Sequence, residues 1–384
     1  MKVTLMGIFV LGLTWQSIAE AIPAFARKHQ AQCTMCHTAW PSLNIVGRTY
    51  KENGYRIARE SAVDGMGWEK TFPVSMILKA RPFEDTDLGA KKLRVLHEAE
   101  VMIAGELAED FSGFMEIEAE DDAGEGFEPE IPVATIGWHP LRAANVQFNW
   151  GPATWADPYD VYSNTRKLTR NRASVYNEKF DGADNDNRLR SKRQNFTLYG
   201  RPIEQAFYSL SINGIGGDPV AENGEIYSGR LAVDIMPSIM IGAMFVQGTC
   251  AANANDFITE CAVERKFTRA SVDAQADFGN FRIMGAYLQA KGDDSSGVNE
   301  ETNNAVFGEA RYIVRSNGRP LWMPLIRVDS YERKDGADEY FEVTLHLSHY
   351  LKQNVRAFVE YLNKNAPDSA KDDYTLTAQL EVGF

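Results

Sequence analysis

Long apolar runs, positive charge and cysteine are all scarce in this sequence. No internal stretch reaches about 18 consecutive apolar residues, which excludes a bundle of membrane-spanning helices. Only 40 Lys and Arg residues oppose 53 Asp and Glu residues, so the formal net charge is −13. An acidic chain has no general attraction for nucleic acid, and no such partner is expected. Hydrophobic residues, 44% of the total, are spread along the 384 residues and predict a folded chain.

The first residues differ from the rest and read as a targeting segment. Lys2 is followed by an apolar run from Val3 to Trp15, and Ala19-Glu20-Ala21 then forms a small-residue cleavage site. This pattern predicts a secretory signal peptide over residues 1–21 and a mature protein outside the cytoplasm. The alternative is an ordinary buried N-terminal helix.

Residues 71–384 show a period of two that is typical of strands with one apolar face. The alternation is clear in residues 115–119, 272–278, 355–361 and 374–384, where apolar residues take every second position. We therefore expect an all-β domain over 71–384, preceded by a small helical segment over 22–70.

The connections between these strands also alternate, short with long. Short turns are predicted near residues 109–110, 142–143, 202–203, 237, 279, 317–318 and 352. Longer polar loops fall between them, near residues 82–92, 121–132, 151–189, 214–225, 248–265, 290–303, 332–338 and 363–372. This layout predicts a transmembrane antiparallel β-barrel of about 16 strands in the bacterial outer membrane, in contact with its lipid. A soluble β-sandwich is the alternative.

Aromatic residues near the predicted strand ends fit the interface girdles of such a barrel. They are Trp138, Trp150, Tyr199, Tyr208, Tyr287, Tyr312, Tyr331, Tyr361 and Tyr374. If the sheet were a sandwich, the same residues would belong to its core.

The motif that carries chemistry is Cys33-Thr-Met-Cys36-His37, which reads Cys-x-x-Cys-His. Two thiols at this spacing can add to the two vinyl groups of one haem, while the adjoining His37 ligates the iron. The motif therefore predicts one haem c. A thioredoxin-like redox pair would follow a βα unit, and a zinc site would need a second ligand pair nearby; the sequence around the motif offers neither.

The sixth iron ligand stays open at this stage. Met66, in a glycine-flanked loop after the predicted helix, is the first choice, because a thioether could fold back onto the iron. His29 lies only four residues before Cys33, and His97 sits on a predicted strand, so it could reach only a haem inside the barrel. Met35 lies within the attachment loop, on the wrong side.

The residues around the motif resemble the N-terminus of the fused outer-membrane cytochrome–porins, whose best-known members oxidise iron. The similarity spans about 35 residues and includes Pro23, Phe25, Ala26, Arg27, Cys33, Cys36, His37, Pro41, Leu43, Gly47, Arg48, Lys51, Gly54 and Tyr55. It implies a single-haem cytochrome segment before a porin barrel. It also implies that electrons pass from an extracellular reductant such as Fe(II), through the haem, to a periplasmic electron-carrier protein.

Two further functional hypotheses remain beside this one-electron oxidoreductase. The first is a solute-selective porin whose haem segment is a structural or redox-sensing plug. The second is a soluble periplasmic cytochrome with a β-sandwich domain. Charged residues on the predicted inner strand faces could attract Fe(II), although they would also simply solvate a porin lumen. They are Arg94, Glu98, Glu100, Glu116, Glu118, Asp234, Asp273, Asp277, Glu309, Arg311, Arg356 and Glu360.

Two loop features complete the sequence-based predictions. Cys250 and Cys261 flank a polar segment in one predicted extracellular loop and are expected to form a disulfide, with metal ligation as the alternative. Loop 151–189 is the longest and is rich in aromatic and arginine residues. It could fold inward as a constriction or meet a partner, but an ordinary surface loop is the simpler expectation.

Overall fold

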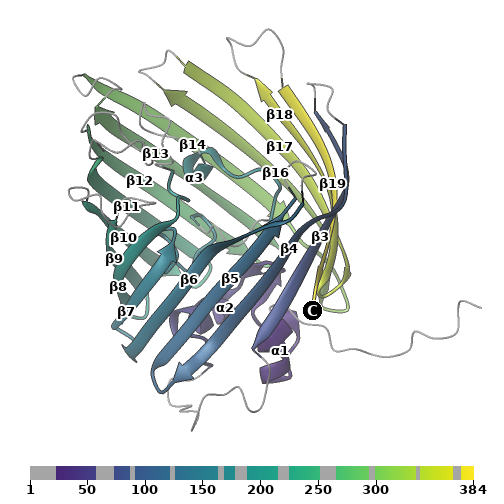
Figure 1. Cartoon of the computed structure of the whole chain (residues 1–384), viewed down its shortest axis with the longest axis horizontal. Coiled ribbons are helices and arrows are strands. Elements are labelled where there is room, and N and C mark those ends of the chain that lie inside the picture. The colour runs from purple at the N-terminus through teal and green to yellow at the C-terminus, as the bar shows by residue number, and fades with distance from the viewer. Residues whose placement is uncertain are drawn as a thin grey trace, which may run out of the picture.

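The structure, a computed structural model, describes eleven parts of the chain: residues 23–57, 73–86, 91–121, 126–162, 168–177, 188–214, 225–250, 265–293, 299–333, 338–365 and 373–384. Figure 1 shows two components within them: a short N-terminal segment and a large barrel that surrounds part of it. We call residues 23–57 the docked segment.

The docked segment is a chain of very short elements. They are α1 (Pro23–His29), the 3-10 turn η1 (Cys33–Met35), β1 (His37–Ala39), β2 (Ser42–Leu43) and α2 (Ile45–Glu52). Helix α2 begins where the side chain of Asn44 accepts a hydrogen bond from the Gly47 amide at 3.0 Å. The chain turns away after it at Gly54, whose φ of 67° suits glycine. None of the described helices is long and apolar enough to cross a membrane.

The barrel is one closed antiparallel ladder. Its strands are β3 (Val74–Thr86), β4 (Lys91–Ala108), β5 (Phe111–Glu120), β6 (Glu128–Leu141), β7 (Ala144–Gly151), β8 (Arg193–Ile203), β9 (Ala206–Gly214), β10 (Glu225–Met236), β11 (Ile239–Cys250), β12 (Arg265–Phe278), β13 (Phe281–Asp293), β14 (Glu300–Tyr312), β15 (Val314–Ser316), β16 (Arg319–Arg333), β17 (Asp338–Lys352), β18 (Val355–Asn365) and β19 (Asp373–Gly383). Strand β19 pairs with β3 and closes the ring. Because β14 and β15 are two parts of one crossing, interrupted at Ile313, the described barrel has 16 crossings. The predicted all-β barrel is confirmed.

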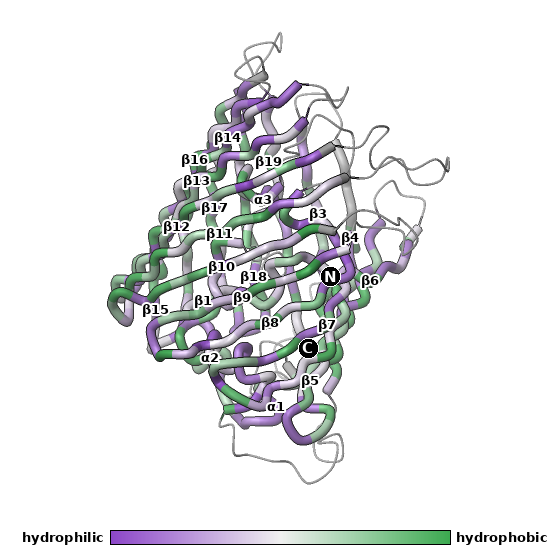
Figure 2. The backbone as a smooth tube through the Cα atoms, turned by 90° about the vertical axis from the view of Figure 1, so that its left-hand side faces the viewer, coloured by the Kyte–Doolittle hydropathy of each residue, from purple (hydrophilic) through white to green (hydrophobic). Residues whose placement is uncertain are grey.

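Side chains alternate along the strands between the outer and the inner face of the barrel wall, and the two faces differ in polarity. Leu210, Ile241 and Phe245 are about half exposed on the outside, at 55%, 48% and 47%. Arg230 and Asp273 are buried on the inside, and Figure 2 shows hydrophilic and hydrophobic residues alternating along the strands. An apolar outside and a charged inside are what a lipid-facing barrel requires.

Two sequence-based details need correction. The strands run further than predicted: β3 reaches Thr86 and β4 begins at Lys91, so most of the loop predicted at 82–92 is strand. In the aromatic set, Trp138 and Tyr312 are exposed as expected, but Tyr199 and Tyr331 are buried at 2% and 4% exposure. These two rings face the interior, because an aromatic near a strand end can take either face of an alternating strand.

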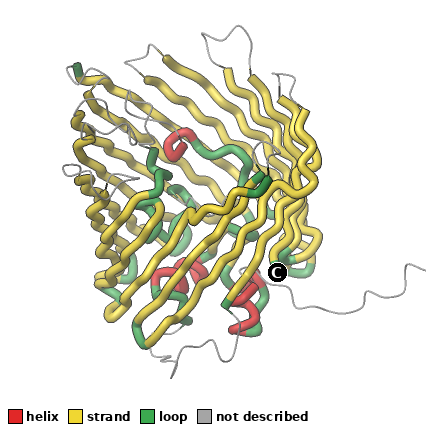
Figure 3. Tube along the Cα trace, viewed as in Figure 1, coloured by secondary structure: helices red, strands yellow, loops and turns green. Residues whose placement is uncertain are grey.

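The docked segment lies inside the end of the barrel that carries the short turns, as Figures 1 and 3 show. The turns at this end include Glu109–Asp110, Asn317–Gly318 and Gln353–Asn354. The main-chain amide of Cys33 donates to the Gln353 side chain at 2.9 Å, and Arg56 pairs with Asp110 at 2.9 Å. The docked segment therefore fills the end of the barrel that carries the short turns.

The outer apolar surface predicts a depth-dependent cost for a new charge. Leu231→Arg, placed in the middle of β10, should destabilise the lipid-embedded barrel by about 2–4 kcal/mol. The control Met236→Arg, beside the turn after β10, should cost about 1 kcal/mol or less. Reversible urea unfolding in lipid vesicles measures both. Equal costs at the two positions would contradict a lipid-facing belt.

Candidate functional site

Ion pairs fix the docked segment to separate parts of the barrel wall. Glu52 on α2 receives two hydrogen bonds from the Arg201 guanidinium, at 2.6 and 2.9 Å, and both side chains are about nine-tenths buried. Two further pairs are Lys28 with Glu106 and Arg56 with Asp110, each at 2.9 Å. Removing one member of a buried pair leaves the other charge unbalanced, which costs about 3–5 kcal/mol. These pairs therefore specify where the segment sits.

Hydrogen bonds to its main-chain groups hold the same segment on other sides. Ser75 on β3 accepts from the Ala24 amide at 3.0 Å, and Tyr350 on β17 donates to the Trp40 carbonyl at 2.8 Å. Arg315 on β15 donates to the Thr38 carbonyl at 2.8 Å. Because these partners come from strands around the ring, the segment is anchored across the full width of the lumen.

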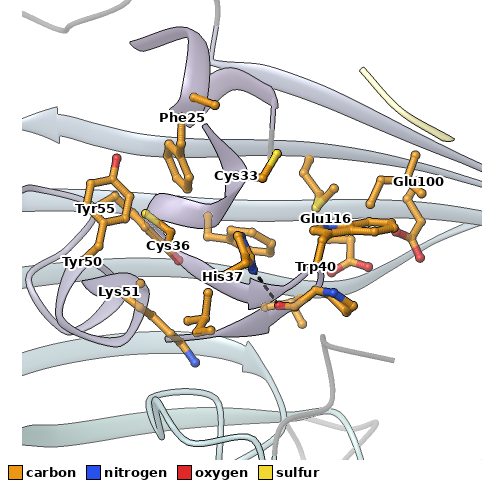
Figure 4. Close-up of a pocket in the computed structure, with 18 of the residues that line it drawn as sticks. Phe25, Cys33, Cys36, His37, Trp40, Tyr50, Lys51, Tyr55, Glu100 and Glu116 are labelled. Atoms are coloured by element: carbon orange, nitrogen blue, oxygen red, sulfur yellow. Dashed lines mark hydrogen bonds between the residues drawn. The ribbon is translucent and has the colours of Figure 1, made fainter. Parts of the chain in front are cut away.

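A cavity of about 500 Å³ separates the docked segment from one side of the wall. Cys33, Cys36 and His37 all line it, and Figure 4 shows their side chains around the same space. Pockets of 300–1,000 Å³ typically hold cofactor-sized molecules. The structure thus brings the three predicted site residues together at a cavity of suitable size.

The orientation of His37 suits an iron ligand. Its Nδ1 is 3.0 Å from the carbonyl oxygen of Pro41 (Figure 4). A ring nitrogen that donates to a carbonyl fixes the tautomer and makes Nε2 the nitrogen for metal binding. The same contact also holds the ring plane, so the turn presents His37 in one orientation.

Helix α2 positions the Cys-x-x-Cys-His turn through two residues. A Cβ on Gly47 would lie 2.2 Å from the carbonyl oxygen of Cys36, so only glycine permits this approach. Asn44 donates from its side chain to the Met35 carbonyl at 3.0 Å and caps α2 at the same time. Sequence reasoning included Gly47 in the family resemblance but missed Asn44. The signal was available, since Asn directly before an amphipathic stretch is a helix-capping residue.

The burial of Cys36 disfavours thiol exchange. It raises the pKa of the Cys36 thiol above its ordinary value. Disulfide exchange uses the thiolate, which a raised pKa makes scarcer. A thioether, which carries no charge, is compatible with the same burial.

The candidates for a sixth ligand have different outcomes. Met66, the first choice, lies outside the described residues, so its position is not compared with the cavity. His29 and Met35 line the cavity, and so does Met102 from the inner face of β4, which sequence reasoning missed. Burial and the neighbouring Lys28 lower the pKa of His29, which keeps the imidazole neutral. His97 lies against Glu120 instead, with Nε2 2.9 Å from a carboxylate oxygen.

The predicted disulfide falls at the edge of what the structure describes. Cys250 is the last residue of β11, where its backbone pairs with Arg265. The side chain of Cys250 and all of Cys261 lie outside the described residues, so the disulfide stays a prediction.

One side of the cavity is a wall of carboxylates. Those that line it from β4, β5 and β6 are Glu100, Glu116, Glu118, Glu120 and Glu130. Oxygen atoms of Glu98, Glu100 and Glu118 lie within 4.8 Å of one another, as do ligand atoms of His97, Glu98 and Glu120. Lys79 compensates part of this charge: its ammonium donates to Glu98 at 2.7 Å and also pairs with Glu100. Lys192, which also lines the cavity, pairs with Glu130 at 2.6 Å, so the negative charge of the wall is partly balanced.

The expectation of an ordinary surface loop after β7 is wrong. Two of its described parts, residues 151–162 and 168–177, fold into the lumen, and Figure 1 shows α3 (Ser174–Asn177) inside the barrel. We call these parts the inner loop. Tyr159 and Tyr162 are fully buried, and the Ser174 amide donates to Asp329 of the wall at 2.7 Å. The aromatic residues of this loop therefore form the buried core of a segment that fills part of the lumen.

Comparisons with solved structures give the class of fold. The anion-selective porin from Comamonas acidovorans superposes with a TM-score of 0.62 at 12% identity, over 81% of this chain and 98% of that chain. Salmonella typhi OmpF in complex with daunomycin gives 0.59 at 15% identity, over 82% and 98% of the two chains. OmpT of Vibrio cholerae gives 0.59 at 11% identity, over 82% and 98%.

The chain therefore has the fold of the outer-membrane porins. No family model and no curated protein matches the sequence. At identities this low the comparison establishes the barrel alone, and the chemistry must be argued from the docked segment.

The close contact at Gly47 predicts a local defect. Gly47→Ala should push α2 away from the Cys36 carbonyl and destabilise the docked segment by about 1–3 kcal/mol. Limited proteolysis of the folded barrel should then cut residues 23–57 faster. The control is Thr49→Ala, an exposed position on the same helix. Unchanged cleavage in the glycine variant would contradict the packing described here.

Proposed function

We propose that this protein is an outer-membrane electron conduit. One haem c, attached to Cys33 and Cys36 and ligated by His37, would pass single electrons between an extracellular donor and a periplasmic carrier. The observation that supports the proposal is the shared cavity of about 500 Å³, onto which all three motif residues face. Short turns face the periplasm in barrels of this kind, and this supports a haem site near the periplasmic mouth.

The chain's own residues fit the group in several ways. Cys33 and Cys36 would anchor it, and Pro41 orients His37. Trp40, Tyr50 and Tyr55 add apolar surface to the cavity and exclude water. A bound haem c supplies a one-electron couple whose potential depends on its ligands and on burial. No acid–base or nucleophilic step is needed, which agrees with outer-sphere electron transfer.

The carboxylate wall supports a cationic donor such as Fe(II). A second cavity of about 230 Å³ borders the first and is also lined by the inner loop, with charges of both signs. Its charged lining residues are Lys79, Arg81, Glu98, Glu120, Arg170, Arg172, Arg190 and Glu381. Carboxylate oxygens are preferred by hard divalent cations. Fe(II) that reaches the glutamates of β4 and β5 would find oxygen ligands beside the haem cavity.

Exposed apolar residues of the docked segment also line the cavity and would suit the docking of an electron-carrier protein. Ile45, Val46 and Ile57 line the cavity and are 58%, 41% and 52% exposed. An electron carrier docking over this apolar mouth would come close to the edge of the bound group.

The first test is the covalent group itself. The double variant Cys33→Ser/Cys36→Ser should fold as a barrel but carry no covalent haem, measured by pyridine haemochrome spectra and by mass. Cells with the parent protein should reduce the haem when Fe(II) is added outside. A parent protein without covalent haem, made in cells that attach haem c, would refute the conduit.

The second test addresses the carboxylate wall. Glu118→Gln should slow reduction by Fe(II) roughly tenfold at low ionic strength, because one charge of the attracting wall is lost. Reduction by neutral or anionic reductants should not slow. Stopped-flow absorption of the haem bands measures both rates, with the exposed Glu339→Gln as control. Equal slowing with all reductants would rule out a role in attracting cations.

The porin fold favours a second candidate function, a solute porin with the docked segment as a plug. The observation for it is the similarity of the barrel to solved porins. Against it, the docked segment and the inner loop both occupy the lumen. Conductance in planar bilayers distinguishes the two: porin-sized steps without reduction by Fe(II) would favour the plug.

A further inference from the structure

Part of the haem cavity is formed by barrel strands, and this part carries one thioether. Cys33, Cys36 and His37 line the cavity from the docked segment, whereas β3 to β6 and β19 line it from the barrel. A haem ligated by His37 on one face leaves its opposite face to residues outside the attachment turn. Among the described barrel-strand residues that line the cavity, Met102 on β4 is the one with a thioether, and none has an imidazole.

Met102 is an apolar residue on a mostly acidic inner face. The ladder places it between Ser75 of β3 and Glu116 of β5. Glu116 lines the same cavity as Cys33 and His37 (Figure 4). The side chain at position 102 therefore points into the lumen at the level of this cavity. Its neighbours on the inner face of β4, all buried, are Glu98, Glu100, Ala104 and Glu106.

The packing of Met102 joins it to the docked segment. Met102 is 7% exposed and belongs to the same buried apolar cluster as Cys33, Trp40 and Ile77. Methionine has three rotatable bonds and a polarizable sulfur, so its thioether can turn within an irregular space. Methionine and histidine together are an axial ligand pair of haem iron in electron-transfer proteins. The position and the chemistry of Met102 are therefore those of an axial ligand.

The other candidate ligands that line the cavity are less suited. The His29 Nε2 lies 2.9 Å from the Tyr50 hydroxyl, and the two rings meet edge to face with centroids 5.3 Å apart. The Lys79 ammonium is held by two glutamates of β4, and an ammonium has no lone pair for a metal. Met35 lies between the two cysteines of the attachment loop. A ligand from the wall has none of these constraints.

We propose that the thioether sulfur of Met102 is the sixth ligand of the haem iron, opposite His37. This inference rests on the proposed haem. The iron then has one ligand from the docked segment and one from the barrel wall, so the axial bonds join the two components. The barrel also influences the reduction potential directly, because a methionine ligand raises it.

The test compares Met102→Leu with Met66→Leu in the full-length haem protein. Leucine keeps most of the apolar volume of methionine but cannot ligate iron. The ferric parent should show the long-wavelength charge-transfer band of an iron–sulfur bond, and the reduced parent a methionine methyl signal shifted far upfield by the haem ring current. Met102→Leu should lose both signals and have a lower midpoint potential. Met66→Leu should keep all three properties. So should the control Met240→Leu, a buried methionine of β11 outside the cavity lining.

A measurement on the parent protein covers the case in which Met102→Leu does not fold. In isotope-labelled reduced protein, the upfield methyl signal should show contacts with Ser75 and Glu116, the ladder neighbours of position 102. A haem-loaded Met102→Leu protein that retains the band and the methyl signal would overturn the inference. So would a haem-loaded parent that lacks them, or their loss in Met66→Leu. Absence of covalent haem from the parent would instead refute the proposed function.

Discussion

Burial of the docked segment against the charged inner wall is the interaction on which the candidate site depends. Residues 23–57 contain two helices of seven and eight residues, too short to be stable alone in water. The buried Glu52–Arg201 pair and the hydrogen bond between Gln353 and the Cys33 amide supply what the segment lacks. These contacts with the barrel fix the shape of the turn at Cys33–His37. The cavity is therefore formed by the docked segment and the barrel together.

Buried ion pairs, within the wall and between the wall and the inner loop, determine how the lumen is arranged. Lys79 sits between Glu98 and Glu100, and Arg230 bridges Asp157 of the inner loop and Asp273 of β12. In a low-dielectric interior such charges are stable only when paired. The inner loop therefore follows the wall charges that can pair with it. The same pairing leaves glutamates concentrated near β4 and β5, in the lining of the cavity that Cys33, Cys36 and His37 share.

Local patterns explain what could be predicted from the sequence, and long-range pairing explains what could not. Strands and turns follow from a period of two, which any ten residues display. The Cys33–His37 motif is equally local, because its chemistry depends on spacing alone. The inward path of the inner loop depends on contacts such as Ser174 with Asp329, 155 residues apart, which no window of sequence contains. The placement of Tyr199 and Tyr331 was wrong for a related reason. The sequence shows that successive side chains point to opposite faces of the sheet, but the register with neighbouring strands decides which face points into the lumen.

The porin fold alone does not distinguish solute diffusion from electron transfer, so the proposed function draws its support from the contents of the lumen. A diffusion pore needs a continuous aqueous path, whereas an electron needs a redox group held in packed protein within reach of both sides. Here Tyr159 and Tyr162 of the inner loop are fully buried, and Trp40 is buried in the docked segment. Barrel strands supply partners to both inserts, so neither can leave without exposing paired charges. Buried arginines of the wall hold both inserts in place, and a lumen that is filled in this way supports the proposed conduit.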